Sequence, residues 1–472
     1  MIVAKTHSCM LGRNAESSVR HYPSKLLCYN QSRVTHHHHS LFLTTQKCYT
    51  SAISMQLRPI KPSTLEQFVA QHPLGSFVQS AANATRVAQL GWQPHYLGLF
   101  AEGERLVATA VLFEWRTLGY SEFECLQGPL VDYHNPAVLS ILLTELKEYV
   151  KAYKGILLRL QPPLILRQGS DPTQLTEVAG TAKTLQQLEK AGFRAIPPRQ
   201  TDCNARYVRW FFVKDLSPYH DDEALLKSFD AKTRSCVKAA TKYGVAVREI
   251  TAVDDLAPFA KLLIDTGTRR GFSGRNEAFY QQLFRAFHRK QAWFLIAELD
   301  LTGYQARLSA QHDSLQAERD MLATEPDKQG QVKELDNQLA AVSKRLADYE
   351  ALRQAANGDV LPLAAAIFMH TSDNEVVYFL SGSDDQHAKF SGSYALQYAA
   401  MCRAISLGAQ CYNFYGTSGN FNGFPEQEGV YHFKKGFGGQ LEERAGCYEY
   451  IARPFIHQVV RFMRAARKII AR

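Results

Sequence analysis

The sequence predicts an α/β fold of the α+β kind, made of two similar subdomains with a helical hairpin inserted in the second. Strand-like and helix-like segments alternate through residues 55–215, and again through residues 216–299 and 358–452. This alternation indicates mixed strands layered with helices, because an all-β or all-helical fold would keep one period throughout. At residues 300–357 the pattern changes to a seven-residue repeat that is typical of paired helices.

The first subdomain, residues 55–215, carries start and stop signals for its helices. Ser63 is expected to cap a helix, with Gln67 behind it, and Gly192 gives the stop signal of another helix. The expected helices are Ser63–Gln71, Val78–Leu90, Pro136–Ala152 and Gln186–Ala191, and the expected strands are residues 95–117 with a turn at Glu102–Glu104, Phe123–Gln127, Gly155–Leu160 and Val208–Val213.

The second subdomain repeats this alternation on either side of the inserted hairpin. Gly244 ends its first long helix, since glycine readily takes the left-handed conformation of a helix C-terminus. The expected helices are Lys232–Tyr243, Leu256–Thr268, Glu277–Phe287 and Ala395–Leu407, and the expected strands are Val245–Ile250, Ala292–Leu299, residues 361–371, residues 374–383 and Gln410–Tyr415.

The inserted segment predicts an antiparallel coiled-coil hairpin. Leucines recur every seven residues from Leu301 to Leu322, and after the polar turn TEPDKQG apolar residues recur at spacings of 4, 3, 4 and 3 from Leu335 to Tyr349. Each helix would have about 25 residues and a length of roughly 35–40 Å at 1.5 Å per residue. One hairpin can bury its own seam, so a monomer and a homodimer through the heptads both remain open.

Composition restricts the partners and the chemistry. The net charge of +9 and the pI near 9.0 indicate an anionic partner, whether nucleic acid, a phosphorylated ligand or a membrane surface. The nine cysteines have no zinc-site spacing and fit reduced cytosolic thiols, so no metal is expected. No apolar run approaches the length of a membrane span. The sequence also lacks a GxxxxGK[ST] phosphate loop and a helix-opening GxGxxG, which disfavours ATP-driven and dehydrogenase functions.

Residues 1–54 show neither helical nor strand periodicity, and no signal-peptide pattern. We expect this segment to be disordered or a mis-assigned start, with the working protein beginning at Met55. A degenerate organellar transit peptide is the alternative, because the segment is basic, rich in serine and poor in acids.

The segment Cys411–Gly439 is the strongest candidate for a binding surface. It interleaves eight aromatic residues with seven glycines and the adjacent Lys434 and Lys435, and it has only two acids. Glycine permits close backbone approach, aromatic rings provide flat walls, and lysine is a point charge suited to phosphate. The segment therefore suits a large anionic ligand, whereas the alternative interpretation is an aromatic strand and hairpin with solvent-facing lysines.

Two further basic segments could contact phosphate. Lys232, Lys238 and Lys242 fall on one predicted helix, where they would contact a tRNA backbone or simply form a solvated face. Arg275 and Tyr280 lie in the stretch TGTRRGFSGRNEAFY, which offers bidentate contacts and a stacking wall or, alternatively, charges flanking a helix.

The C-terminal segment, residues 453–472, predicts a basic amphipathic helix. It carries six Arg or Lys and no acid, and Phe455, Val459, Phe462 and Met463 fall on or near one helical face. Such a helix lies on anionic lipid or contacts RNA. The alternative is that the apolar face packs on the protein and the basic side faces water.

Taken in order, these segments resemble the Fem family of peptidoglycan bridge-forming aminoacyltransferases. The matching pieces run from HPLGSFVQS and GWQPHYLGLFAEGERLVATAVLF, through FDAKTRSCVKAATKYGV and GRNEAFY, to YNFYGTSGNF and GVYHFKKGFGG, across about residues 73–450. The resemblance implies two subdomains like acetyltransferase (GNAT) folds, and it likens the hairpin to a seryl-tRNA-synthetase arm. It also implies a cytoplasmic enzyme that needs no cofactor beyond aminoacyl-tRNA as co-substrate.

The implied reaction moves an amino acid from aminoacyl-tRNA to the side-chain amine of the third stem-peptide residue, a lysine, or to the growing bridge. The acceptor would be a cell-wall precursor, either lipid II or UDP-MurNAc-pentapeptide, reached with possible peripheral contact at the inner membrane face. By resemblance, Phe433 and Lys434 are the catalytic pair. Arg275, Tyr280 and, more weakly, Tyr378 would contact the precursor.

The sequence departs from the family pattern at its first precursor contact. Asn83 and Val87 stand where some members carry a tryptophan and a lysine, and Arg86 is a possible substitute. Two other functions remain open: an acyl-CoA N-acetyltransferase, although the pyrophosphate loop that it needs is not found, and a non-enzymatic coiled-coil RNA-binding protein. The transferred amino acid and its position in the bridge are left open.

Overall fold

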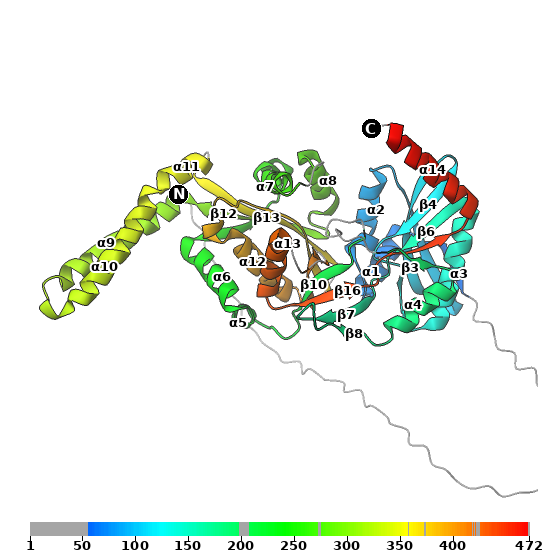
Figure 1. The fold of residues 1–472 in the computed structure, drawn as a ribbon, viewed down its shortest axis with the longest axis horizontal. Helices are drawn as coiled ribbons and strands as arrows, with labels where there is room; N and C mark the ends of the chain where they lie inside the picture. Colours follow the sequence, from blue (N-terminus) through cyan, green and yellow to red (C-terminus); the bar gives the residue numbers. More distant parts are fainter. Residues whose placement is uncertain are drawn as a thin grey trace, which may run out of the picture. The chain divides into compact units, whose positions relative to one another are not determined.

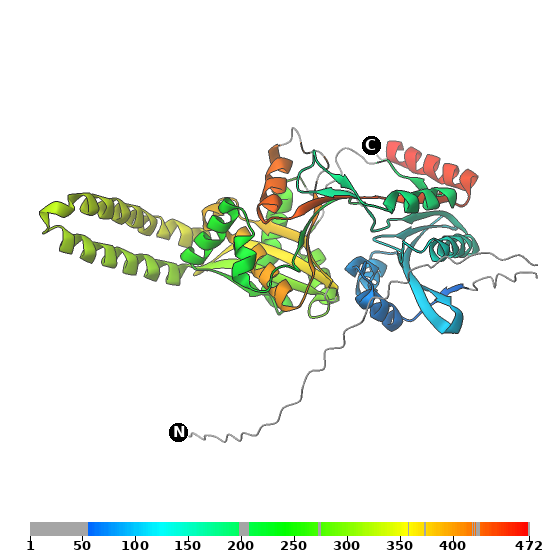
Figure 2. The same ribbon diagram turned by 90° about the horizontal axis from the view of Figure 1, so that it is seen from below.

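A computed structural model describes residues 55–197, 207–271, 275–356, 358–371, 374–417, 419, 421 and 425–470, with the side chains of 425–428 and 467–470 excepted. The predicted extension, residues 1–54, lies outside the described residues. The described residues belong to one compact unit built on two β-sheets (Figures 1 and 2). Among them, no helix is long and apolar enough to cross a membrane.

The first sheet has the strand order β1-β2-β3-β4-β6-β17-β9, with β5 paired to β3. Only β4 and β6 run parallel, and α3 makes the crossover between them. The apolar side of α3 packs on this sheet through buried leucines such as Leu139 and Leu146. The strands are Gln56–Pro59 (β1), Gln93–Ala101 (β2), Arg105–Thr117 (β3), Tyr120–Cys125 (β4), Leu130–Val131 (β5), Gly155–Leu160 (β6), Arg194–Ala195 (β9) and Tyr448–Ile451 (β17), and the helices are Pro62–Gln71 (α1), Ala81–Ala88 (α2), Pro136–Ala152 (α3) and Thr181–Lys190 (α4).

The second sheet has the order β11-β12-β13-β14-β15-β10-β16-β7-β8. The strands are Ile165–Gly169 (β7), Thr176–Glu177 (β8), Trp210–Asp215 (β10), Val245–Glu249 (β11), Ala292–Asp300 (β12), Val360–Thr371 (β13), Glu375–Ser383 (β14), Cys411–Thr417 (β15) and Gln440–Arg444 (β16). The helices around it are Asp222–Lys227 (α5), Ala231–Tyr243 (α6), Leu256–Arg269 (α7), Glu277–Phe287 (α8), Gly392–Ser406 (α12) and Pro425–Gly436 (α13).

Helices cover both faces of the second sheet, so its central strands are apolar on both sides. Along β12, Leu295 and Ala297 point toward α6, α12 and α13, whereas Phe294 and Ile296 point toward α7 and α8. This alternation follows from the two-residue period of a strand. Figure 1 shows the two helical groups on opposite sides of the strands.

The inserted hairpin is confirmed as two antiparallel helices, α9 (Leu301–Leu322) and α10 (Gln329–Ala347), which lie side by side in both views (Figures 1 and 2). A short third helix, α11 (Tyr349–Ala356), leads back to β13. The predicted seam is buried near the sheet, where Leu308 and Val342 pack with residues of β12 and β13. Toward the tip the seam stays closed, since Val332 and Leu335 are 8% and 6% exposed, whereas Met321, outside the seam, is 74% exposed.

The predicted α/β class is confirmed, and several expected elements differ in their ends. Ser63 does not cap α1, which begins at Pro62 after Lys61. The helix expected from Val78 starts at Ala81, because Ser80 Oγ accepts the N–H of Asn83 and fixes the helix start there.

The interpretation of residues 411–439 as a strand and hairpin is wrong. The strand β15 is followed by the helix α13, which carries Phe433, Lys434 and Lys435. The glycines in this segment obscured the helix, because glycine is a poor helix former and a usual sign of turns.

The domain boundaries remain a prediction, and strand pairing crosses them. The strand β17, expected in the second subdomain, is hydrogen bonded to β6 in the first sheet. Conversely, β7 and β8 lie in the second sheet beside β16. Each predicted subdomain therefore contributes strands to the sheet of the other, and these strands connect the two sheets.

Candidate functional site

Lys434 lies on α13 with its side chain directed at the end of β15. Its Nζ donates to the carbonyl oxygen of Gly416 at 2.6 Å and lies 3.5 Å from that of Tyr415. The residue is only 5% exposed. A buried ammonium held by backbone carbonyls is a positive charge fixed in place, unlike the mobile charge of a surface lysine.

The end of β15 has an irregular backbone that presents these carbonyls. Tyr415 takes a left-handed conformation with φ of 62°, which is uncommon for a residue other than glycine. Its N–H donates to Asn413 Oδ1 at 2.7 Å, an interaction that stabilises a local turn. The register of β15 against β10 also shifts between Phe211 and Val213. The strand is therefore bent where Lys434 meets it.

A network of polar groups beside this bend holds the four surrounding strands together. Asn413 Nδ2 donates to Glu375 Oε1 at 2.8 Å, which ties β15 to β14. On β16, Arg444 donates to Glu442 Oε2 at 3.0 Å, and its guanidinium lies 4.0 Å from the ring centroid of Phe211 on β10. Burial raises the pKa of Glu375, while Arg444 and Asn413 act in the opposite direction. No local sequence pattern indicated this network.

The C-terminal end of α13 is anchored by a second lysine, Lys214 on β10. Lys214 is 1% exposed, and its Nζ donates to Gly438 O at 3.1 Å and to Ser228 Oγ at 3.0 Å. Burial lowers the pKa of Lys214. The N–H of Asp230 donates to Gly436 O at 2.9 Å. These contacts fix the position of the helix that carries Lys434.

The neighbours of Lys434 on α13 face different surroundings. Phe433 is partly buried against the apolar core, with its ring 5.1 Å from that of Tyr394 and 5.3 Å from that of Phe437. Lys435 is 44% exposed at its side chain and lies 3.9 Å from Asp171. The two adjacent lysines thus differ in burial and partners.

Arg275 and Tyr280 are brought together on the other face of the second sheet. Tyr280 is 1% exposed within the core under α7 and α8, whereas Arg275 is exposed just before α8. Burial raises the pKa of Tyr280, and the charge and hydrogen bond of Arg275 act against this rise. The Arg275 side chain thus lies close to the tyrosine hydroxyl, while the tyrosine ring is enclosed.

Tyr415 connects these two regions. Its carbonyl oxygen faces Lys434, while its ring packs edge-on against those of Phe211 and Phe379, each at 5.6 Å. Burial raises the pKa of Tyr415, and the charges of Arg444 and Arg275 oppose that rise. The left-handed turn at Tyr415 therefore joins a cationic group on one face of the sheet to a cationic group on the other.

The remaining predicted residues lie apart from Arg275. Tyr378 stacks on Phe368 at 5.6 Å, on the face that α6, α12 and α13 cover. It is therefore not grouped with Tyr280. Three exposed lysines lie on α6, whose first residues meet the end of α13. These are Lys232, Lys238 and Lys242.

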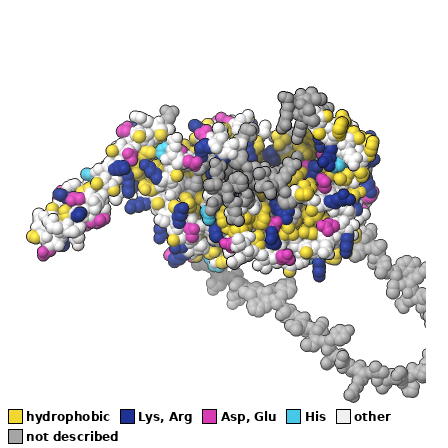
Figure 3. All heavy atoms as spheres, in the orientation of Figure 1, with side chains coloured by type: hydrophobic (Ala, Val, Ile, Leu, Met, Phe, Trp, Pro, Cys, Tyr) yellow, Lys and Arg dark blue, Asp and Glu magenta, His cyan; other side chains and the backbone are white. Residues whose placement is uncertain are grey.

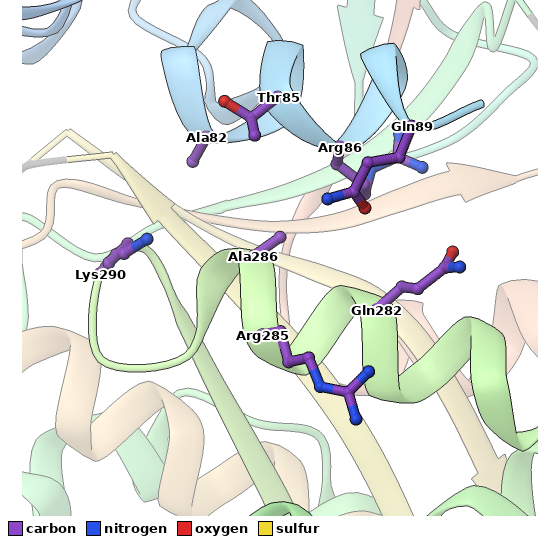
Figure 4. A pocket seen from close by; sticks show the side chains of 8 residues that line it. All are labelled: Ala82, Thr85, Arg86, Gln89, Gln282, Arg285, Ala286 and Lys290. Carbon is purple, nitrogen blue, oxygen red and sulfur yellow. The ribbon is translucent and has the colours of Figure 1, made fainter. Parts of the chain in front are cut away.

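A cavity of about 350 Å³ lies between α2 and α8, and Figure 4 shows its lining. Arg86 from α2 is half-buried and donates to Asn83 Oδ1 at 3.0 Å. Burial lowers the pKa of Arg86, which remains a cation because arginine titrates far above neutral pH. Arg285 and Lys290 line the same cavity, and no acid does. Two of these cations were missed from the sequence, because only the packing of α2 on α8 brings them to Arg86.

No group of His, Cys, Asp and Glu within the described ranges could hold a metal ion. The site brings together cations, aromatic rings and backbone carbonyls. Such a set binds anions and orients substrates, and it offers positive charge to a transition state that develops negative charge.

Comparisons with known proteins found relatives that share most of the chain. A family model described as the FemAB family matches residues 60–465. Aminoacyltransferase FemA of Staphylococcus aureus (strain MRSA252) is 25% identical over 389 residues, covering 81% of this chain and 91% of that protein. FemA of Staphylococcus epidermidis (strain RP62A) is 25% identical over 401 residues, covering 84% and 95%. The crystal structure of FemX superposes with a TM-score of 0.71 at 25% identity, covering 86% of this chain and 99% of FemX.

The bend at Tyr415 is expected to depend on Asn413. Replacing Asn413 by alanine removes the acceptor of the Tyr415 N–H and a donor to Glu375, and should lower the free energy of unfolding by about 1–3 kcal/mol. Urea denaturation would measure this loss. Gln410→Ala, at an exposed position just before β15, is the control and should change stability by less than about 0.5 kcal/mol. Equal effects of the two substitutions would contradict the role given to Asn413.

Proposed function

Because the chain belongs to the FemAB family, we propose that it transfers an amino acid from aminoacyl-tRNA to a peptidoglycan precursor. The acceptor is the side-chain amine of the stem-peptide lysine, or the end of the growing bridge. The observation that carries this proposal is the ammonium of Lys434, buried and fixed at the bend of β15. Relatives named as aminoacyltransferases support the same class of reaction.

In this reaction the neutral amine of the precursor attacks the ester carbonyl of aminoacyl-tRNA. An amide bond forms, the ester C–O bond breaks, and the amine proton passes to the departing ribose hydroxyl. The tetrahedral intermediate carries a negative charge, which a fixed ammonium stabilises. Lys434 is the group proposed for this task or for holding the 3′ end of the tRNA, with Phe433 as a wall beside it. Holding the two substrates in line supplies much of the remaining acceleration.

The precursor carries a diphosphate in both its UDP-linked and its lipid-linked forms, and the cations around α8 suit it. Arg275 precedes α8, and the cavity with Arg86 lies along the same helix. A guanidinium can contact two phosphate oxygens at once. Tyr280 is enclosed, so its proposed part is to position Arg275. Tyr378 would contact only a ligand that approaches from the Lys434 side.

The tRNA is proposed to lie along α6 and the base of the hairpin. The lysines of α6 are exposed, and Arg307 of the hairpin donates to the carbonyl oxygen of Tyr243 at 2.9 Å, which joins the two elements. Figure 3 shows Lys and Arg side chains around this part of the surface. Phosphate contacts of this kind give affinity without sequence preference.

We place the reaction in the cytoplasm, where aminoacyl-tRNA is made. A lipid-linked acceptor would bring the protein into peripheral contact with the inner face of the membrane. Either a monomer or a homodimer is compatible with the proposal.

Lys434→Met tests the proposal directly. Removing a fixed charge at a developing oxyanion should lower the transfer rate by about 100-fold or more. Lys435→Met is the matched control, one residue away on the same helix, and should leave the rate within about twofold because that side chain faces solvent and Asp171. Transfer is measured as labelled amino acid in the precursor, and thermal unfolding checks that each variant is folded. A folded Lys434→Met protein with the unchanged rate would remove Lys434 from the site.

Arg86→Gln and Arg275→Met are expected to act on precursor binding. Each should raise KM for the precursor by about tenfold or more, as expected from a charge-assisted hydrogen bond worth about 1.5–3 kcal/mol. The KM for aminoacyl-tRNA should stay unchanged. Arg353→Met, at an exposed arginine on α11, is the control. A higher KM for tRNA with an unchanged KM for precursor would reverse the assignment of the two substrates.

A further inference from the structure

The C-terminal helix α14 (Pro454–Ile470) exposes an apolar stripe to solvent. Phe455 and Phe462 are 74% and 75% exposed, and Val459 and Met463 are 40% and 37% exposed. Their spacing of four, three and one residues puts them on one helical face. Figure 3 shows hydrophobic side chains gathered where α14 lies. No described part of the protein covers this stripe.

A different face of α14 holds the helix on the first sheet. Val460 is 2% exposed and packs with Ile156 and Leu157 of β6. His457 is 6% exposed on the same side. Arg464 forms an ion pair with Glu122 of β4 at 2.8 Å. The alternative in which the apolar stripe itself packs on the protein is therefore wrong: the helix is anchored by one face and presents the other.

The charge of the C-terminal segment favours an anionic surface. Residues 453–472 contain six Arg or Lys and no acid. Arg461 is exposed on α14, on a side of the helix away from the stripe. A second copy of this helix would bring like charges together, which opposes self-association through this face. A basic helix whose apolar stripe faces outward fits the interface of an anionic bilayer.

We propose that α14 is a membrane-docking helix, which inserts Phe455, Val459, Phe462 and Met463 among anionic lipids. The anchored face keeps the helix parallel to the membrane surface, so the apolar stripe enters the lipid along its length. This inference does not rest on the proposed transfer reaction, since it needs only the helix, its charges and a lipid surface.

The test is sedimentation of the full chain with vesicles of phosphatidylcholine, alone or mixed with phosphatidylglycerol. The protein should bind the mixed vesicles, and binding should weaken with salt because part of it is electrostatic. The double substitution Phe455→Gln with Phe462→Gln should weaken binding by about tenfold or more, because the stripe supplies the apolar part. Met321→Gln is the matched control at an equally exposed apolar residue (74%) on the hairpin, and should bind as the parent does.

Two results would overturn the proposal. One is unchanged vesicle binding by the double variant, or by Phe462→Gln alone if the double variant does not fold. The other is a parent protein that binds neither vesicle type and is a dimer in solution. If the same substitution then converts this dimer to a monomer, the stripe is an interface between copies. Neither readout involves transfer, so failure here is distinct from failure of the proposed function.

Discussion

The hydrogen bond from Lys434 to the carbonyl oxygen of Gly416 is the contact on which the candidate site depends. It exists because β15 bends at Tyr415, and the bend exists because Asn413 accepts the Tyr415 N–H while it also donates to Glu375. Burying a positive charge costs free energy unless hydrogen-bond acceptors are held in position around it. Strand, bend and helix therefore act as one unit, and Lys214 holds the far end of that unit in place.

The same region joins the two sheets. After α13 the chain enters β16 in the second sheet and then β17 in the first. From the other side, Phe77 in the turn before α2 packs edge-on against Phe287 of α8 at 6.3 Å, which seats α2 against α8. The cavity with Arg86 is thus formed by the packing of the two halves. A substitution at Phe77 or Phe287 would therefore change the position of the cations that line the cavity, although it replaces none of them.

Periodicity predicted the regular parts of this fold well. The helices Pro136–Ala152 and Glu277–Phe287 were predicted at their observed bounds, since each has a clear apolar period and a cap. The hairpin was equally clear from its heptads. The pairing of β17 with the first sheet could not be predicted, because four residues carry no periodic signal and their partners are far away in sequence. The left-handed Tyr415 and the grouping of Arg285 with Arg86 likewise depend on tertiary contacts that no local pattern records.

We propose that this chain joins an amino acid from tRNA to a cell-wall precursor. The most direct measurement incubates the full chain with a mixture of charged tRNAs and a lysine-containing muropeptide precursor, and follows the mass of the precursor. We expect a precursor heavier by one aminoacyl residue, formed with charged tRNA and not with uncharged tRNA or acetyl-CoA. A precursor that gains no aminoacyl residue from any of the charged tRNAs, or that gains an acetyl group from acetyl-CoA instead, would contradict the account.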